Sequence, residues 1–414
     1  MSSLADLKTV IAPCKSDDVP KLLAEVAAAG DVFSKAGDKA TAERLALLKK
    51  TRELTHALET PREIMIQHLW ADPSRVMAIN FGVRVGLWTT MSKNGDGPQK
   101  VNDLAKQVGV QEELLRRMMQ HVAAAGCLDL TAPDEYTPNN FSKSMALAVM
   151  SSGYYSAPCI LNPIFLAAHD WLKGRGYTVP TSNLDTAYQI AHKTDMHWFA
   201  HMQTSPPHGE NFNDHMFGYL LGRPAWSDIY PVKERLIDGF DMENKDAVMM
   251  VDIAGGIGHY SAQFHANFPD APGRLVVEDL PFVIGGIKDL PPKIEKVSHD
   301  MFTEQPIKGA RAYFTHFVLH DWPDEDAIKI ASRVRDAMKP GYSKFLINEH
   351  VVPTMNQDYE QTALDLIMMA GFAGKERSAA QWSDILERVV GLKITNIWTG
   401  VNGIESVVEC IRPE

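Results

Sequence analysis

The chain has 414 residues, 45% hydrophobic and 22% charged, and is long enough for two or three domains that each bury a core. The formal net charge of −11 argues against a nucleic acid or an anionic membrane as partner, because such binding depends on Lys and Arg contacts to phosphates. The four cysteines are widely separated and form no CxxC pair, and the chain lacks both a signal-peptide core and an apolar run of about 20 residues. These features predict a soluble, cytoplasmic protein with reduced thiols.

Residues 1–150 predict a helical, winged-helix-like dimerisation domain. Apolar side chains at helical spacing predict helices at residues 19–29 and 41–58, and Pro61 opens another. These helices have little around them against which to bury their apolar faces. They either cap the following domain or form a self-association surface, and we favour the second, which predicts a homodimer.

The second half of this domain has the order helix, turn, helix and β-hairpin. The helices are expected at residues 101–108 and 111–125, and the hairpin strands at residues 127–130 and 135–137. DNA binding through Arg116 would be the obvious function of such a pattern. Basic residues are not gathered on one face, however, so we expect a scaffold or dimerisation role and no nucleic-acid partner.

Residues 151–244 form a connecting segment that is rich in aromatic side chains and histidines. Methionine and flat aromatic rings make adaptable walls for planar ligands, although most such side chains are simply core. The histidines do not repeat at a metal-binding spacing, so no metal is expected. The residues that we expect to line a pocket for a small aromatic molecule are His197, Trp198, Phe212, His215 and Met216.

Residues 245–414 alternate between strand and helix, which predicts an α/β domain with a doubly wound, mostly parallel sheet. The helix after residue 323 is marked by a proline and three acids in its first turn. Strands are expected at residues 248–253, 274–279, 294–298, 310–320 and 342–348, followed by a hairpin of residues 392–399 and 405–411 around Asn402-Gly403.

A glycine-rich turn follows the first of these strands. Gly255, Gly256 and Gly258 let the backbone approach a ligand where a Cβ atom would collide. The second strand ends in Asp279, about twenty residues later, which is the spacing that brings a carboxylate to a ribose diol. By itself, the turn is equally compatible with an ordinary strand–turn–helix unit.

The details of the turn exclude two common nucleotide sites. Ser261 stands where the third glycine of a dinucleotide-binding motif would be, and no Lys-Ser or Lys-Thr pair marks a P-loop. Asp252, just before the turn, supplies a carboxylate that suits a cationic ligand better than a pyrophosphate. Because ligands of such sheets bind beyond the carboxyl ends of the strands, the turn should converge there with Asp279, Asp300, His320 and Glu349.

Six segments carry a family resemblance: VDIAGGIGH, VEDLP, HDMF, VLHDWPDEDA, LINEH and GKER. They resemble the small-molecule O-methyltransferases that use S-adenosylmethionine, most closely the fungal polyketide and phenol enzymes and more distantly the plant caffeate type. The resemblance covers nearly the whole chain and implies a seven-stranded Rossmann-like sheet behind an N-terminal dimerisation domain.

The resemblance also implies residue roles. His320 would be the general base, flanked by Glu349 and Glu376. The substrate pocket would include Asp365 and Met369. The cofactor contacts would be Asp252, Gly255, Gly256 and Gly258 over the methionine part, Asp279 and Leu280 at the ribose, and Asp300, Met301 and His316 at the adenine.

The chemistry fits a histidine base. A phenol with a pKa near 10 is mostly protonated at neutral pH, and an imidazole with a pKa near 6.5 is a suitable proton acceptor. A neighbouring carboxylate would fix its tautomer. Structural alternatives stay open: His320 could merely end a strand, Asp321 could cap the next helix, and Glu376 could pair with Lys375 or Arg377 on a solvated loop.

Three positions depart from the family pattern: Ala254 replaces a glycine, Glu278 stands where fungal members would have glutamine, and His316 stands where relatives often have Lys or Arg. The main alternative function is a pericyclase or dehydratase that keeps the cofactor without transferring methyl. Retention of His320 together with both glutamates favours methyl transfer. A winged-helix regulator with a degenerate ligand domain is a third alternative, which the acidic charge disfavours.

Overall fold

The computed structural model describes residues 4–37, 40–400 and 403–414. Within these ranges no helix has the length and apolarity needed to cross a membrane, and no cluster of His, Cys, Asp and Glu is arranged to hold a metal ion. The chain divides into two compact units, the first made of Met1–Ile160 and Ser205–Leu221, the second of Leu161–Thr204 and Gly222–Glu414.

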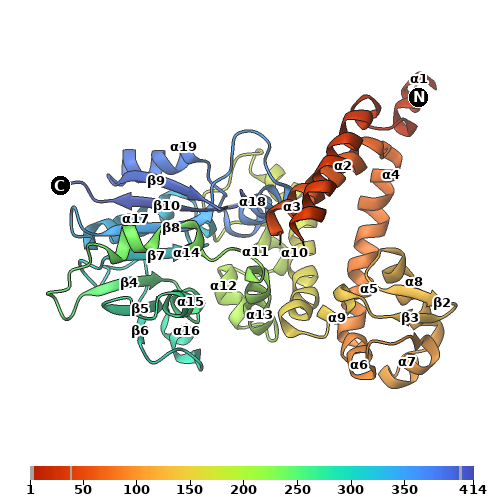
Figure 1. Cartoon of the computed structure of the whole chain (residues 1–414), viewed down its shortest axis with the longest axis horizontal. Helices are drawn as coiled ribbons and strands as arrows, with labels where there is room; N and C mark the ends of the chain where they lie inside the picture. Colours follow the sequence, from red (N-terminus) through yellow and green to blue (C-terminus); the bar gives the residue numbers. More distant parts are fainter. Residues whose placement is uncertain (1–3, 38–39, 401–402) are drawn as a thin grey trace. The chain divides into compact units, whose positions relative to one another are not determined.

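The N-terminal part of the first unit is helical, as predicted (Figure 1). One helix boundary was wrong: α2 (Val19–Ala36) continues through Gly30 and ends at Gly37, whose φ of 81° suits a glycine after a helix. A single glycine inside a helix costs only about 1 kcal/mol, so it need not end one. The helices of this part are α1 (Leu4–Ile11), η1 (Ser16–Asp18), α2, α3 (Thr41–Leu58), α4 (Pro61–Ile66), η2 (Gln67–Ala71), α5 (Asp72–Arg84) and α6 (Leu87–Asn94).

The predicted pair of helices and the hairpin that follows them are confirmed, as α7 (Val101–Val108), α8 (Glu112–Ala124) and the strands β2 and β3. A third strand, β1, was missed because it has only two residues and pairs with β3 far along the chain. The remaining elements of this unit's ranges are β1 (Gln99–Lys100), β2 (Asp129–Ala132), β3 (Glu135–Thr137), α9 (Asn140–Ser144), the start of α10 (Ala148–Gly174) and α13 (His208–Leu220).

The second unit is built on a seven-stranded sheet with the order β6-β5-β4-β7-β8-β10-β9 (Figure 1). The strands from β6 to β8 are parallel, and β10 runs antiparallel to both neighbours. This confirms the predicted doubly wound, mostly parallel sheet. Its strands are β4 (Val248–Ile253), β5 (Arg274–Asp279), β6 (Ile294–Ser298), β7 (Ala312–His316), β8 (Lys344–His350), β9 (Lys393–Thr399) and β10 (Glu405–Ile411).

The prediction of one long strand at residues 310–320 was wrong. β7 ends at His316, because Phe317 has a left-handed backbone with a φ of 47° that turns the chain out of the sheet. A short 3₁₀ turn, η4 (Leu319–Asp321), follows. The predicted final hairpin is confirmed as a pair of antiparallel strands, but Asn402 of its turn lies outside the described residues.

Helices bury both faces of the sheet. Side chains alternate between the faces along each strand, so Tyr313 packs with helices α17 and α19 while its neighbour Phe314 packs with α14 and α15. This double coverage explains why the central strands read as continuous apolar runs. The remaining helices of this unit are α11 (Ala187–His192), α12 (Trp198–Gln203), α14 (Trp226–Ile229), η3 (Lys233–Ile237), α15 (His259–Asn267), α16 (Pro281–Gly286), α17 (Asp324–Ala337), α18 (Tyr359–Phe372), α19 (Ala379–Ser383) and η5 (Asp384–Val389).

Candidate active site

His320 and Glu376 form a buried hydrogen-bonded pair in the second unit. The Nδ1 atom of His320 lies 2.6 Å from Oε1 of Glu376, and each residue is 5% exposed. Because Nδ1–H donates to the carboxylate, the other ring nitrogen, Nε2, is the atom available for chemistry. Nε2 lies 3.5 Å from Oδ1 of Asp321. The resemblance had given Asp321 no role.

The alternative in which Glu376 lies on a solvated loop was wrong. Lys375 and Arg377 both bind Asp324 instead, at 2.6 and 2.9 Å. The loop is pressed against the turn that carries His320, and the Lys375 N–H donates to the His320 carbonyl at 3.0 Å. Gly374 makes this approach possible, since a Cβ at that position would collide with the same carbonyl oxygen.

Glu349 holds the backbone of the turn and not the imidazole. Its Oε1 accepts the N–H groups of Val318, Leu319 and His320 at 3.2, 2.6 and 3.3 Å. A carboxylate that accepts hydrogen bonds from three backbone amides at the start of a short helix is stabilised by the partial positive charge of those amides. Glu349 therefore fixes the position of the backbone at His320, whereas Glu376 binds the imidazole ring.

The charges around His320 change its acidity. Burial lowers the pKa of an imidazole, but the carboxylates of Glu376 and Asp321 outweigh it and raise the pKa of His320 to about 10. The pKa near 6.5 that we expected from the sequence was therefore too low. Burial raises the pKa of Glu376, yet His320 more than offsets this and holds the pKa of Glu376 at about 2.

Asp321 does not cap the following helix. The N-cap position of α17 is Pro323, which has no side-chain capping bond, and Asp321 lies inside η4. Burial raises the pKa of Asp321 to about 7, although the neighbouring His320 opposes the shift. The N-cap interpretation was wrong because the chain makes a separate 3₁₀ turn before α17 begins.

The glycine turn lies against a buried carboxylate. Asp252 is 1% exposed, accepts a hydrogen bond from Oγ of Ser261 at 2.8 Å, and lies so close to Gly255 that a Cβ there would be 2.6 Å from its carboxyl carbon. Ser261, which sequence reasoning used only to exclude a dinucleotide motif, thus anchors Asp252. Burial raises the pKa of Asp252 to about 7. Ala254 adopts a left-handed φ of 53°, a conformation that glycine reaches more readily than alanine.

Asp279 ties three segments together. Its carboxylate accepts the N–H of Gly256 at 2.8 Å and of Leu280 at 2.7 Å, and its carbonyl accepts the N–H of His299 at 2.9 Å. The structure thus brings the glycine turn and the end of β5 together with the segment that carries Asp300. Each carboxylate oxygen keeps a lone pair that could accept from a ribose hydroxyl.

The residues predicted to flank the adenine differ in exposure. Asp300 is exposed and its Oδ1 accepts the N–H of Phe302 at 3.0 Å, while Met301 is half-buried. Both follow β6 at the same edge of the sheet as Asp279. Their contacts with a cofactor stay predictions.

His316 is held as a neutral ring. Asn348 donates its amide to the Ser406 carbonyl at 3.1 Å, so its oxygen accepts from Nδ1 of His316, at 2.7 Å, and Nε2 accepts from the hydroxyl of Tyr260. Burial lowers the pKa of His316 to about 3. His316 therefore brings no positive charge to this position.

Part of the predicted substrate wall lies beside the His320 turn. His197 stacks on Trp322, with ring centroids 5.2 Å apart, and Trp198 stacks on Phe372 at 4.6 Å. Trp322 directly follows Asp321, so His197 is brought close to the turn that holds His320.

Two predicted substrate contacts lie on α18. Asp365 accepts the N–H of Glu376 at 2.9 Å and so supports the carboxylate that binds His320. Met369 is half-buried one helical turn further along. Asp365 therefore has a structural task besides the substrate contact predicted for it.

The other predicted substrate residues belong to the first unit, on α13. His215 packs against Gly153, where a Cβ would collide with the imidazole ring, and burial lowers the pKa of His215. Phe212 and Met216 are half-buried on the same helix. As substrate contacts, these three residues stay predictions.

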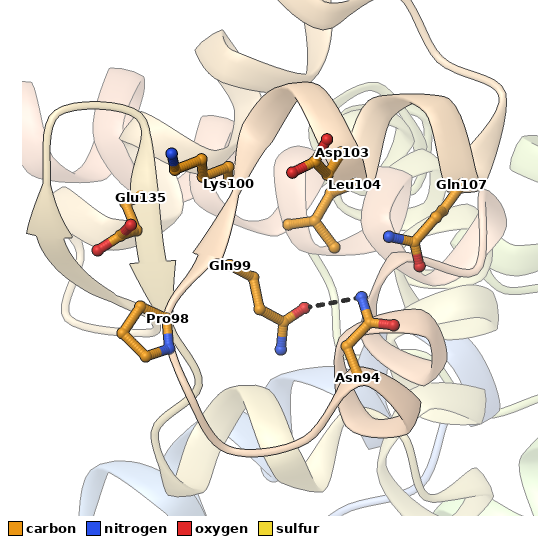
Figure 2. A pocket seen from close by; sticks show the side chains of 8 residues that line it. All are labelled: Asn94, Pro98, Gln99, Lys100, Asp103, Leu104, Gln107 and Glu135. Atoms are coloured by element: carbon orange, nitrogen blue, oxygen red, sulfur yellow. Dashed lines mark hydrogen bonds between the residues drawn. The ribbon is translucent and has the colours of Figure 1, made fainter.

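A cavity of about 400 Å³ lies in the first unit, and none of the residues predicted for the cofactor or the base lines it. Figure 2 shows the side chain of Gln99 bonded to that of Asn94 inside it. Gln99 also donates to the carbonyls of Met91 and Gly95, at 2.9 and 2.8 Å, so its amide is satisfied within the fold. We assign no role to this cavity, whose lining residues are Asn94, Pro98, Gln99, Lys100, Asp103, Leu104, Gln107 and Glu135.

The residues present suit S-adenosylmethionine. The glycine turn is open at Gly256, where an added Cβ would meet nothing within 4 Å, and Asp279 is anchored beside it. The neutral ring of His316 adds no positive charge next to a cationic ligand. The glycine turn, Asp252 and Asp279 would hold the cofactor. His320 lies on the turn that follows β7, the strand next to β4 in the sheet.

Comparisons with known proteins agree with this site. Residues 187–390 match the O-methyltransferase domain family. The chain is 34% identical to the O-methyltransferase mpaG of Penicillium brevicompactum over 88% of this chain and 92% of that protein. It is 35% identical to demethylsterigmatocystin 6-O-methyltransferase of Aspergillus parasiticus over 80% and 83% of the two chains.

A solved structure supports the same fold. LepI, a pericyclase solved in complex with S-adenosylmethionine, matches 96% of this chain with all of its own, at a TM-score of 0.85 and 26% identity. The identity to mpaG extends over most of both proteins, and the sheet, the glycine turn and the His320–Glu376 pair are all present. The chain therefore belongs to the family of S-adenosylmethionine-dependent O-methyltransferases.

Proposed function

We propose that the methyl acceptor is a phenolic hydroxyl of an aromatic or polyketide-like secondary metabolite, and that His320 removes its proton. The observation that carries this proposal is the buried 2.6 Å bond between His320 and Glu376, which leaves Nε2 as the ring nitrogen that exchanges a proton with the acceptor. Aromatic rings at His197, Trp198 and Trp322 near the same turn suit a flat acceptor. The relative from Aspergillus parasiticus, by its name, methylates the oxygen at position 6 of demethylsterigmatocystin.

Proton transfer to His320 is favoured by matched acidities. S-adenosylmethionine, when bound, supplies an electrophilic methyl group. A phenol with a pKa near 10 and an imidazolium with a pKa of about 10 share a proton at little cost in free energy. Nε2 takes the proton from the phenol oxygen, and Glu376 stabilises the imidazolium that results.

Two supporting groups keep this geometry. Glu349 binds three backbone amides of the turn, and Gly374 lets the Glu376 loop approach the His320 carbonyl. Both hold the base before any ligand arrives, and such preorganisation is what makes general-base catalysis efficient.

The test is mass spectrometry of purified protein incubated with S-adenosylmethionine and a panel of phenolic and polyketide acceptors. We expect S-adenosylhomocysteine together with a product heavier by one methyl group. His320→Ala should lower turnover by roughly 10²–10⁴-fold, the usual contribution of a general base, with cofactor affinity nearly unchanged. Full turnover by this variant would show that His320 is not the base.

A second candidate is favoured by one observation at His197. Its Nδ1 accepts the N–H of Phe199 at 3.3 Å, so the ring proton is on Nε2, and this buried donor has no hydrogen-bond partner within the described ranges. Burial lowers the pKa of His197 to about 4, so the ring is neutral. Such a donor could activate a carbonyl, as a pericyclase or dehydratase would require. In the same assay, an isomerised or dehydrated substrate with unconsumed cofactor would establish this candidate.

We also propose that the protein is a homodimer formed through its N-terminal helices and has no nucleic-acid partner. Large apolar side chains are exposed there, among them Ile11, Leu69 and Trp70 at 66%, 66% and 65%. Arg116 is engaged by three carboxylates, which leaves it poorly suited to phosphates. Analytical ultracentrifugation should show a dimer that Trp70→Glu dissociates, whereas Met242→Glu, at another exposed apolar position, should not; a monomeric wild type would contradict the proposal.

A further inference from the structure

His350 is a fully buried histidine to which the catalytic roles above assign nothing. It ends β8 directly after Glu349 and is 0% exposed. Considering the residues that the structure describes, neither of its ring nitrogens has a hydrogen-bond partner. Buried polar groups are nearly always paired, and an unpaired one destabilises the folded state. A buried imidazole ring without hydrogen-bond partners therefore indicates a functional role.

The group that His350 faces is Glu376. Its Nδ1 lies 3.4 Å from Oε2 of Glu376, and this oxygen too lacks a hydrogen bond from any described residue. The distance exceeds the usual 2.7–3.2 Å for an N–H···O bond, so a shift of either side chain by a few tenths of an ångström would complete the hydrogen bond. The ring of Phe317 stands edge-on to His350, at 5.0 Å between centroids, and closes the other side.

Glu376 thus lies between two imidazoles, with Oε1 on His320 and Oε2 towards His350. A carboxylate that accepts a second hydrogen bond holds its charge more tightly and attracts the proton on its first partner less. A donor at His350 would therefore make His320 easier to deprotonate. Without that donor, more of the enzyme would carry a protonated base at neutral pH.

We propose that His350 is a positioning residue that donates Nδ1–H to Oε2 of Glu376 and thereby tunes the basicity of His320. The inference rests on the proposed role of His320 as general base. His350 would not touch the substrate; it would act through Glu376.

The other charged groups around the pair have partners of their own. Asp365 accepts the N–H of Glu376, and Glu349 accepts the amides before His320. Glu405, opposite His350 on β10, binds Arg223. The charged or titratable groups that face this cluster are His316, His320, Asp321, Glu349, Asp365, Glu376, Arg377, Glu405 and Arg223.

The experiment compares the pH dependence of kcat/KM for the wild type, His350→Phe and His350→Asn. Phenylalanine keeps the ring without a donor, whereas asparagine retains an amide N–H near the position of Nδ1. We expect His350→Phe to move the acidic limb of the profile to higher pH by about 0.5–1 unit, the scale of one lost hydrogen bond to a charged group. His350→Asn should keep the limb at the wild-type position, and cofactor affinity should be unchanged in both variants.

An unmoved limb in His350→Phe, or an equal shift in both variants, would overturn the proposal. If His350→Phe does not fold, ¹⁵N NMR of the histidine-labelled wild type still decides, because it reports whether Nδ1 of His350 carries a proton. An unprotonated Nδ1 would overturn the proposal as well. This measurement needs no turnover, so it is distinct from failure of the proposed function, which would show as no methylated product with any acceptor.

Discussion

The imidazole of His320 and the carboxylate of Glu376, 56 positions apart in the sequence, meet at 2.6 Å in a fully buried contact. His320 comes from the turn after β7, and Glu376 from the loop after α18. Because both are excluded from water, the charge on one decides the protonation of the other. The behaviour of the enzyme with pH should therefore follow this pair.

Glu376→Gln should lower kcat/KM and move its acidic limb to lower pH. The carboxylate is what keeps the pKa of His320 raised, so without its charge the pKa falls as burial dictates. The imidazolium formed during the reaction also loses its partner, and we expect roughly a 100-fold loss in kcat. Glu304→Gln, which neutralises an exposed glutamate paired with Lys308, is the matched control. An unchanged limb in Glu376→Gln would mean that the pair does not set the titration.

Asp279→Ala should weaken binding of S-adenosylmethionine at least about tenfold, measured by isothermal titration calorimetry. The variant loses the acceptor predicted for the ribose and also the bonds to Gly256 and Leu280 that hold the glycine turn. Hydrogen bonds to charged groups are each worth about 1.5–3 kcal/mol. Asp270→Ala, at an exposed carboxylate in the same unit, should bind normally. Wild-type affinity in Asp279→Ala would remove the assignment.

Asp252→Asn should stabilise the ligand-free protein at alkaline pH. The pKa of Asp252 is raised to about 7 by burial, so the folded protein holds this proton more tightly than the unfolded chain does. Wild-type stability contributed by this group is therefore lost as pH rises from about 4 to about 7. Asparagine cannot ionise and avoids the loss, on the order of 1–4 kcal/mol at about 1.36 kcal/mol per pKa unit.

Thermal melts at pH 5 and pH 8 would check this. The difference in Tm between Asp252→Asn and the wild type should be small at the lower pH and positive at the higher one. Asp300→Asn, which changes an exposed carboxylate, serves as the control. A stability difference that does not depend on pH would contradict the expectation.

Gly374→Ala should impair catalysis through the position of Glu376. A Cβ at residue 374 would collide with the His320 carbonyl, so the loop must retreat and take the carboxylate with it. We expect a loss in kcat of at least about tenfold, because proton transfer is sensitive to small misplacements. Gly285→Ala meets nothing within 4 Å and should retain full activity. Equal activities of the two variants would show that the close approach is unimportant.

Local pattern was sufficient for most of the fold. Strands β4, β5 and β6 begin and end where the sequence predicts; β4 and β5 are short segments with apolar centres, which is a local signal for a strand. The glycine turn and Asp279 likewise follow from spacing along the chain. The boundary after His316 could not be foreseen, since Phe317 is an ordinary strand former whose left-handed conformation depends on its surroundings.

The sequence by itself thus determined the order of most elements and the family, and it predicted His320 as the base, because each depends on neighbouring residues or on motifs read in order. Only the tertiary structure decided which charged side chains pair with one another. Lys375 and Arg377 flank Glu376 in sequence but bind Asp324, and Glu376 is buried between His320 and His350 instead. Burial and pairing depend on segments far apart in the chain, and the free energy of a charge depends on both. No local pattern carries that information.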